Sequence, residues 1–93
     1  MSQEIIILGS TGSIGKSILK IISRDKKKFK IKLLTTNNNI SLIYSQANQF
    51  NVKMVVINNK NNYKKYEKKF KKENIKVFFK ISDALRNFKK KVY

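Results

Sequence analysis

Hydrophobic residues in this chain come in short runs that alternate with amphipathic stretches. Four short runs rich in apolar residues, at 4–8, 29–35, 53–57 and 76–79, are typical of strands, and the first is β-branched and nearly continuous, as in a buried parallel strand. Apolar residues return at helical spacing over 13–23 and 40–50, in the basic segment 60–72, and after Ser82 and Asp83, which we predict to be a helix N-cap. This alternation predicts an α/β fold in which a parallel sheet has helices on both faces.

The turn between the first expected strand and helix contains three glycines, Gly9, Gly12 and Gly15, in a G-x-x-G-x-x-G pattern. A strand, a glycine-rich turn and a helix in this order suit a nucleotide pyrophosphate, because the helix directs free N–H groups at the phosphates. We expect Gly9 to permit a tight turn, Gly12 to admit the pyrophosphate and Gly15 to let the helix pack closely on the sheet. The hydroxyls of Thr11 and Ser13 add donors. The alternative is an ordinary strand–helix turn built of small residues.

A mononucleotide P-loop fits the same segment less well. Gly15, Lys16 and Ser17 match the end of the pattern G-x-x-x-x-G-K-[ST], but its first glycine falls on Ser10. The third apolar run also ends in Asn58, where an ATPase needs an acidic residue to hold magnesium. We therefore expect Lys16 to be a surface lysine in the first helical turn.

The end of the second expected strand bears on which dinucleotide binds. NAD sites usually carry Asp or Glu roughly 20 residues after the glycines, on the ribose 2′-hydroxyl. Here Asn37, Asn38 and Asn39 follow the strand and no carboxylate is present. The absence of a carboxylate favours NADP, and the asparagines offer N–H donors to a phosphate. The alternative is a plain asparagine-rich turn.

The composition is strongly basic, with 22 Lys and Arg against five Asp and Glu and a formal net charge of +17. A polyanion-binding surface and compositional drift toward Lys, Asn and Ile both account for this charge. We favour drift, because arginine, which makes bidentate contacts to bases, is limited to Arg24 and Arg86. Tyr63, Tyr66 and Phe70 keep helical spacing within the basic segment, so we expect them in the core rather than as a stacking platform for bases.

The length and the missing residue types narrow the possibilities further. The 93 residues allow one small domain or part of a larger one. The absence of Cys and His removes disulfides, cysteine-based zinc sites and the commonest general base. No apolar stretch approaches the roughly 20 residues that span a bilayer, and no signal-peptide pattern is visible. We expect a soluble cytoplasmic chain with no membrane association.

Residues 7–15, ILGSTGSIG, resemble the opening of the 1-deoxy-D-xylulose 5-phosphate reductoisomerases, NADPH-dependent enzymes of non-mevalonate isoprenoid biosynthesis. Residues 34–40, LTTNNNI, are similar to the L-T-A-N-K-N-V segment of that family, and the resemblance runs from about residue 5 to about residue 57. It implies that 1–93 is the N-terminal part of a Rossmann-like NADPH-binding domain. In the family the cofactor phosphates contact the positions of Thr11, Gly12, Ser13 and Ile14, and the adenosine ribose with its 2′-phosphate contacts those of Asn37, Asn38 and Asn39. The family commonly has lysine at the position of Asn38, so the charge-assisted contact is lost unless a nearby lysine compensates.

By resemblance, the whole enzyme uses a divalent metal, Mg or Mn, and NADPH to convert a phosphorylated sugar to 2-C-methyl-D-erythritol 4-phosphate, as a homodimer. Its catalytic and metal-binding residues lie past Tyr93, so we expect none within 1–93 and no activity from these residues alone. Two alternatives remain open from the sequence. One is another NADP-dependent Rossmann oxidoreductase, and the other is a small basic nucleic-acid-binding protein.

Overall fold

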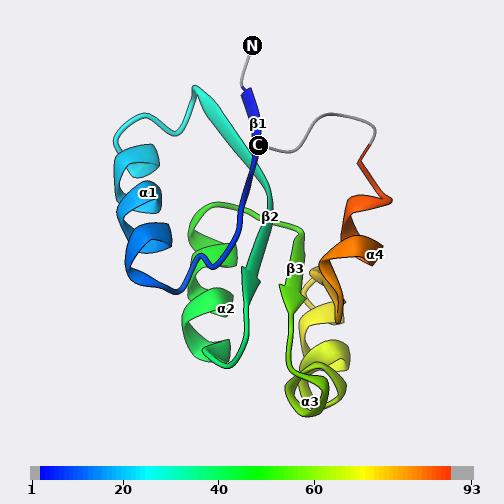
Figure 1. Ribbon diagram of the computed structural model, residues 1–93. Coiled ribbons are helices and arrows are strands. Elements are labelled where there is room, and N and C mark those ends of the chain that lie inside the picture. The colour runs from blue at the N-terminus through cyan, green and yellow to red at the C-terminus, as the bar shows by residue number, and fades with distance from the viewer. Residues whose placement is uncertain (1–2, 89–93) are drawn as a thin grey trace.

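The computed structural model describes residues 3–88, and within them strands and helices alternate strictly (Figure 1). Every expected element is present. Most ends differ from expectation by at most one residue, but the last helix begins before the expected N-cap and ends at Leu85, so Phe88, which was expected in it, lies outside. In chain order the elements are β1 (Gln3–Ile7), α1 (Ser13–Ser23), β2 (Phe29–Thr36), α2 (Ile40–Gln49), β3 (Met54–Ile57), α3 (Lys60–Lys71), β4 (Lys76–Phe78) and α4 (Ile81–Leu85).

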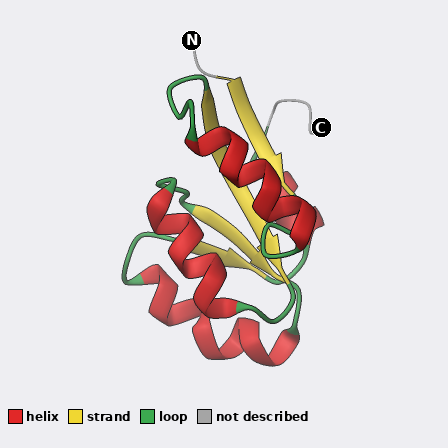
Figure 2. Ribbon diagram, turned by 90° about the vertical axis from the view of Figure 1, so that its left-hand side faces the viewer, coloured by secondary structure: helices red, strands yellow, loops and turns green. Residues whose placement is uncertain are grey.

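The four strands form one parallel sheet in the order β1-β2-β3-β4. Each of the three crossovers therefore moves one strand further in the same direction, and right-handed crossovers of this kind place their helices on a single face. The helices α1, α2 and α3 contribute to one core, whereas α4 packs on the other face. Figure 1 shows α1 and α2 on one side of the strands and α4 on the other, and Figure 2 shows helices lying over the sheet. The expected α/β architecture, with helices on both faces, is confirmed.

The larger core lies between the sheet and α1, α2 and α3. Phe70 of α3 is buried there and meets the ring of Tyr44 edge to face, with ring centroids 5.3 Å apart. Tyr63 and Tyr66 are partly buried against the same core. The expectation that these aromatics of α3 are core residues is therefore confirmed.

An extra residue in β2 sets which side chains enter that core. Ile5 of β1 pairs with Ile31, but the next residue, Ile6, pairs two positions further along β2, so Lys32 is left over. This irregularity lets Ile31 and Leu34 both join the core under α1, α2 and α3, although they are three residues apart. Beyond it, β2 runs on to the polar residues that end the strand beside the glycine turn.

The expected N-cap at Ser82 and Asp83 is wrong. The N-cap of α4 is Lys80, whose side chain makes no capping hydrogen bond, and the helix itself spans Ile81–Leu85. Ala84 is fully buried against β2 and β3, and Ile81 packs against the same cluster. Burial of these apolar side chains positions the helix, so its start is decided by packing rather than by a capping side chain.

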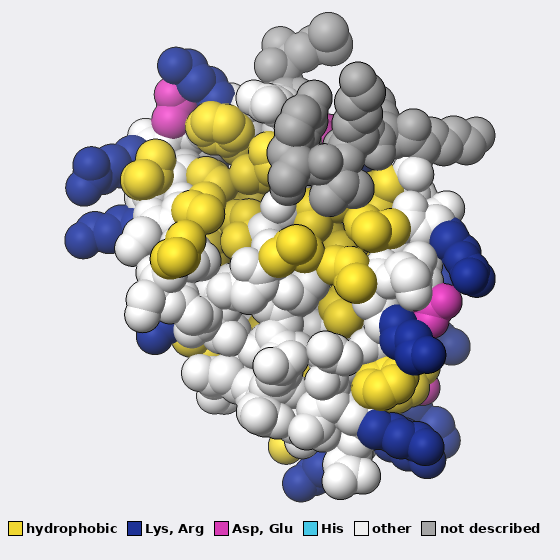
Figure 3. All heavy atoms as spheres, in the orientation of Figure 1, with side chains coloured by type: hydrophobic (Ala, Val, Ile, Leu, Met, Phe, Trp, Pro, Cys, Tyr) yellow, Lys and Arg dark blue, Asp and Glu magenta, His cyan; other side chains and the backbone are white. Residues whose placement is uncertain are grey.

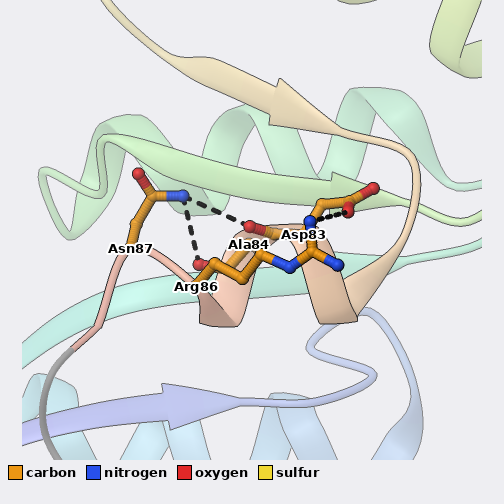
Figure 4. Close-up of polar contacts among 4 residues, drawn as sticks. All are labelled: Asp83, Ala84, Arg86 and Asn87. Carbon is orange, nitrogen blue, oxygen red and sulfur yellow. Dashed lines mark hydrogen bonds and ion pairs between the residues drawn. The ribbon is translucent and has the colours of Figure 1, made fainter.

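Polar side chains of α4 and of the residue Asn87 that follows it contact one another and the helix backbone, but none caps the start of the helix (Figure 4). Asp83 lies in the first turn, where a carboxylate is favoured by the helix dipole, and its Oδ1 is 3.7 Å from Nη1 of Arg86. The side-chain amide of Asn87 donates to the backbone carbonyls of Asp83 and Ala84, at 3.3 and 3.4 Å. These contacts satisfy carbonyl groups at the end of the short helix.

One face of the molecule is apolar and open. Within residues 3–88 no strand pairs with the outer edge of β1. Ile14, Ile18 and Ile21 share a face of α1 and are 79%, 40% and 64% exposed, and Leu8, just past β1, is 58% exposed. Figure 3 shows hydrophobic side chains gathered on this face, with Lys and Arg around it. Leu8 was expected inside the first strand, but β1 ends one residue earlier.

Candidate functional site

A cleft of about 820 Å³ opens where the strands of the sheet end. In parallel α/β sheets ligands bind outside the carboxyl ends of the strands, and this volume falls within the roughly 300–1,000 Å³ of small-molecule sites. The glycine turn, the end of β2, the asparagine-rich turn and the start of α4 form its walls. The lining residues are Leu8, Gly9, Thr11, Gly12, Thr35, Thr36, Asn37, Asn38, Asn39, Val56, Asn58, Lys80, Ile81 and Ser82.

Gly9 makes the tight turn that leads from β1 to α1. Its φ is +66°, a left-handed conformation that favours glycine. Its N–H donates to Oγ1 of Thr35 at 2.7 Å, and its carbonyl accepts from the N–H of Gly12 at 3.0 Å. The expected role of Gly9 is confirmed, and the turn is closed by its own backbone.

Gly15 lets α1 approach the chain very closely. A Cβ atom at this position would lie 2.3 Å from the carbonyl oxygen of Gly9 and 2.6 Å from Cα of Ser10. The close approach expected of Gly15 is therefore present, but its contact is with the turn itself rather than with the sheet. The first turn of α1 and the glycine turn form one tightly packed unit.

Gly12 differs from the other two glycines because the fold does not require it. Its φ of −80° and ψ of 174° suit any residue, and an added Cβ would lie 3.4 Å from the carbonyl oxygen of Gly9. Gly12 lines the cleft at the start of α1. A missing side chain at this point leaves room for a ligand against the backbone.

The start of α1 has no side-chain cap. Its N-cap is Gly12, whereas Asn39 caps α2 by accepting from the N–H of Leu42, and Asn59 caps α3 by accepting from the N–H of Asn62. The first N–H groups of a helix have no acceptor within the helix. At α1 these donors are therefore available to an anion in the cleft.

Three residues distant in sequence, Thr35, Thr36 and Gln46, hold the glycine turn in place. Oγ1 of Thr11 is 2.7 Å from Oγ1 of Thr36, and the N–H of Ser10 donates to the carbonyl of Thr35 at 3.0 Å. Gln46 of α2 is 5% exposed, and its Nε2 donates to the carbonyl of Ser10 at 2.9 Å. In a trans peptide the carbonyl and the following N–H point in opposite directions, so this bond turns the N–H of Thr11 away from Gln46.

The asparagine-rich turn is ordered by neighbouring asparagines. Oδ1 of Asn38 accepts from the side-chain amides of Asn59 at 3.0 Å and Asn62 at 3.3 Å. Its own amide nitrogen donates to no acceptor within residues 3–88, so it can donate to a ligand in the cleft that Asn38 lines. Asn39 lines the same cleft, but its side-chain oxygen is already used to cap α2.

The cleft brings together five of the seven residues expected from the sequence, Thr11, Gly12, Asn37, Asn38 and Asn39. Ser13 and Ile14 are not among its lining residues. They form the first turn of α1, where the side chain of Ile14 is largely exposed. Lys16 is exposed, as expected, and lies on a shallow groove between α1 and α2 instead of in the cleft.

The lining of the cleft carries one ionised side chain, that of Lys80, and no carboxylate. The two tyrosines with raised pKa values, Tyr44 and Tyr63, are not among its lining residues. A hydrogen bond to Glu73 raises the pKa of Tyr44, and a hydrogen bond to Glu67 raises the pKa of Tyr63.

Within residues 3–88 no group of three or more His, Cys, Asp or Glu side chains is placed to hold a metal ion. The helices in this range are all too short or too polar to cross a membrane.

The sequence and the fold are both similar to those of one enzyme family. The family model for 1-deoxy-D-xylulose 5-phosphate reductoisomerase matches residues 5–91. The reductoisomerase of Pelagibacter ubique (strain HTCC1062) is 47% identical over 76 residues, which are 82% of this chain and 20% of that protein. The reductoisomerase of Zymomonas mobilis, solved in complex with NADPH, superposes with a TM-score of 0.75 at 27% identity, over 83% of this chain and 20% of that one. A DOX-P reductoisomerase solved with magnesium superposes with a TM-score of 0.71 at 27% identity, over 84% and 19% of the two chains. The chain thus spans about a fifth of the length of these relatives.

Proposed function

Because the chain belongs to the 1-deoxy-D-xylulose 5-phosphate reductoisomerase family, we propose that residues 1–93 are the N-terminal part of the NADPH-binding domain of such an enzyme. The observation that carries this proposal is the cleft, in which the glycine turn, the uncapped start of α1 and the asparagine-rich turn meet. The similarity to a reductoisomerase solved with NADPH supports it. Because the chain belongs to this family, we no longer keep the alternative of a different NADP-dependent Rossmann oxidoreductase.

In this proposal the cofactor pyrophosphate lies against the turn at residues 11–14. Gly12 leaves room for it and Thr11 adds a hydroxyl, both from the lining of the cleft. The N–H groups of Ser13 and Ile14, which directly follow Gly12 and lack acceptors within α1, are proposed to donate to it. Only the backbone of Ile14 takes part, which agrees with the exposure of its side chain. NADPH supplies a hydride when it is bound in the whole enzyme.

The adenosine end of the cofactor then lies at the other end of the cleft. Asn37, Asn38 and Asn39 are proposed to contact the adenosine ribose and its 2′-phosphate. Asn38 fits this task because its oxygen is occupied and its amide N–H groups are not. The absence of a carboxylate from the cleft lining removes the group that would repel the phosphate.

We propose that catalysis and metal binding belong to the part of the longer relatives that this chain does not cover. We propose that the whole enzyme binds a divalent metal and a phosphorylated sugar substrate and forms 2-C-methyl-D-erythritol 4-phosphate by reduction. It is further proposed to be a homodimer in the cytoplasm. The similarity to a reductoisomerase solved with magnesium supports the metal. The unpaired edge of β1 and the exposed Ile14, Ile18 and Ile21 support a domain that continues beyond the structure described, since such surfaces are normally covered.

A titration of the 93-residue chain with NADPH at low ionic strength tests this proposal. We expect weak, saturable binding, and no oxidation of NADPH when 1-deoxy-D-xylulose 5-phosphate and Mg²⁺ are added, because the chain has no His and no described carboxylate cluster. Cofactor fluorescence measures both results. Absence of saturable binding would overturn the proposal, and turnover would overturn the assignment of catalysis to further residues.

The net charge of +17 predicts a second, non-specific binding behaviour. We expect duplex DNA to bind at low salt and to be released by about 0.15 M salt, because non-specific binding rests on phosphate contacts that salt screens. Fluorescence anisotropy of a labelled duplex over a salt series measures this. Tight binding that survives this salt concentration would favour a nucleic-acid-binding function instead of compositional drift.

A further inference from the structure

We propose that Lys80 gives this chain its preference for NADPH over NADH, by pairing with the 2′-phosphate of the adenosine ribose. The inference rests on the proposed function and goes beyond it, because it assigns cofactor selectivity to one side chain. Lys80 lies between β4 and α4, far along the chain from the glycine turn and from the asparagine-rich turn. The cleft brings all three segments together.

The lining of the cleft carries a single positive charge. Lys80 is the one lining residue whose side chain is ionised at neutral pH, and the remaining lining residues are neutral. A 2′-phosphate brings close to two negative charges at neutral pH. Neutral amides can donate hydrogen bonds to its oxygens, but they bring no positive charge to balance those two negative charges. A phosphate in this cleft therefore finds its counter-charge at Lys80.

No carboxylate competes for Lys80 among the described residues. Asp83, the acidic residue nearest to it in sequence, is paired with Arg86 on the same short helix (Figure 4). The other four acidic residues of the chain all have partners away from the cleft. Glu4 pairs with Lys32, Asp25 with Lys28, Glu67 with Tyr63 and Glu73 with Tyr44.

The backbone of Lys80 has a structural task, but its side chain does not. Its carbonyl accepts from the N–H groups of Asp83 and Ala84 at the start of α4, at 3.2 and 3.4 Å. The side chain makes no capping bond and belongs to none of the described ion pairs. The preceding Phe79 is anchored by its ring contact with Tyr63, at 5.9 Å between centroids. A change of the Lys80 side chain should therefore leave the fold unaltered.

Lys80→Gln, compared with Lys64→Gln, tests the inference. Lys64 is an exposed lysine of α3 outside the cleft lining, so both variants lose the same charge. Dissociation constants for NADPH and NADH are measured for the wild-type chain and both variants at one ionic strength. We expect Lys80→Gln to weaken NADPH binding about tenfold, which corresponds to about 1.4 kcal/mol, and to leave NADH binding within about twofold. Lys64→Gln is expected to leave the ratio of the two constants unchanged.

The outcomes separate this inference from the proposed function. A wild-type chain that binds neither cofactor overturns both. A chain that binds NADPH, but whose NADPH-to-NADH ratio is the same in Lys80→Gln as in the wild type, overturns the inference alone. An equal fall in the affinities for both cofactors also overturns it, because Lys80 would then contact a part that the two cofactors share. A selective loss that shrinks as salt is added supports the inference, since the contact is between exposed charges.

Discussion

Replacement of Gly12 by valine is expected to abolish NADPH binding without unfolding the chain. Gly12 has extended backbone angles that β-branched residues adopt readily, and only the carbonyl oxygen of Gly9 lies close to the position of a new Cβ. The valine side chain would occupy the cleft at the start of α1 and cover the N–H groups there. We expect affinity for NADPH to fall at least about 100-fold, or about 2.7 kcal/mol.

The experiment pairs an NADPH titration with thermal unfolding followed by circular dichroism. Gly12→Ala is the matched variant, because it adds only the Cβ atom and is expected to have an intermediate affinity. Both variants should unfold at temperatures close to that of the wild-type chain. Unchanged NADPH affinity in a folded Gly12→Val chain would refute the assignment of the glycine turn to the cofactor.

Replacement of Gly15 by alanine is expected to destabilise the fold severely. The new Cβ would lie 2.3 Å from the carbonyl oxygen of Gly9 and 2.6 Å from Cα of Ser10, so relief requires α1 to move away from the turn. We expect the free energy of unfolding to fall by at least about 3 kcal/mol, at the upper end of overpacking effects. This is a large part of the roughly 5–15 kcal/mol that stabilises a small domain.

Urea unfolding of Gly15→Ala measures this loss. The expected change in the free energy of unfolding is opposite in sign to that of the same substitution elsewhere in a helix. At an ordinary position inside a helix, alanine is more favourable than glycine by about 1 kcal/mol. Ser17→Ala is the control, because Ser17 is exposed in the same helix and bonds only to the carbonyl of Ser13. If Gly15→Ala proves more stable than the wild type, the close contact between α1 and the turn is not as described.

Hydrophobic patterning was enough to locate the elements of this fold, because each strand coincides with a short run rich in apolar residues and each long helix has an apolar face. It failed at α4. This five-residue helix begins where Ile81 and Ala84 pack on the sheet, and a capping rule applied to Ser82 and Asp83 could not detect that packing. The irregularity in β2 was equally hidden, since it depends on the register with β1.

The candidate site was predictable in part for a similar reason. Glycine spacing located the turn, and the carboxyl ends of neighbouring parallel strands brought it close to Asn38. The supports of the turn were not visible, because Thr36 and Gln46 contact residues 25 and 36 positions away in the chain. Lys80 was missed because its place in the cleft depends on β4 lying beside β3.

Amide chemical shifts of the labelled chain, followed by NMR during titration with NADPH, show whether the cofactor binds in the cleft. We expect saturable shifts at residues 9–15 of the glycine turn and 35–39 of the asparagine-rich turn, with further shifts near Lys80. Titration with tripolyphosphate shows which shifts arise from charge alone. If NADPH moves only the lysine-rich α3, or moves no amide of the glycine turn, the cleft is not the cofactor site.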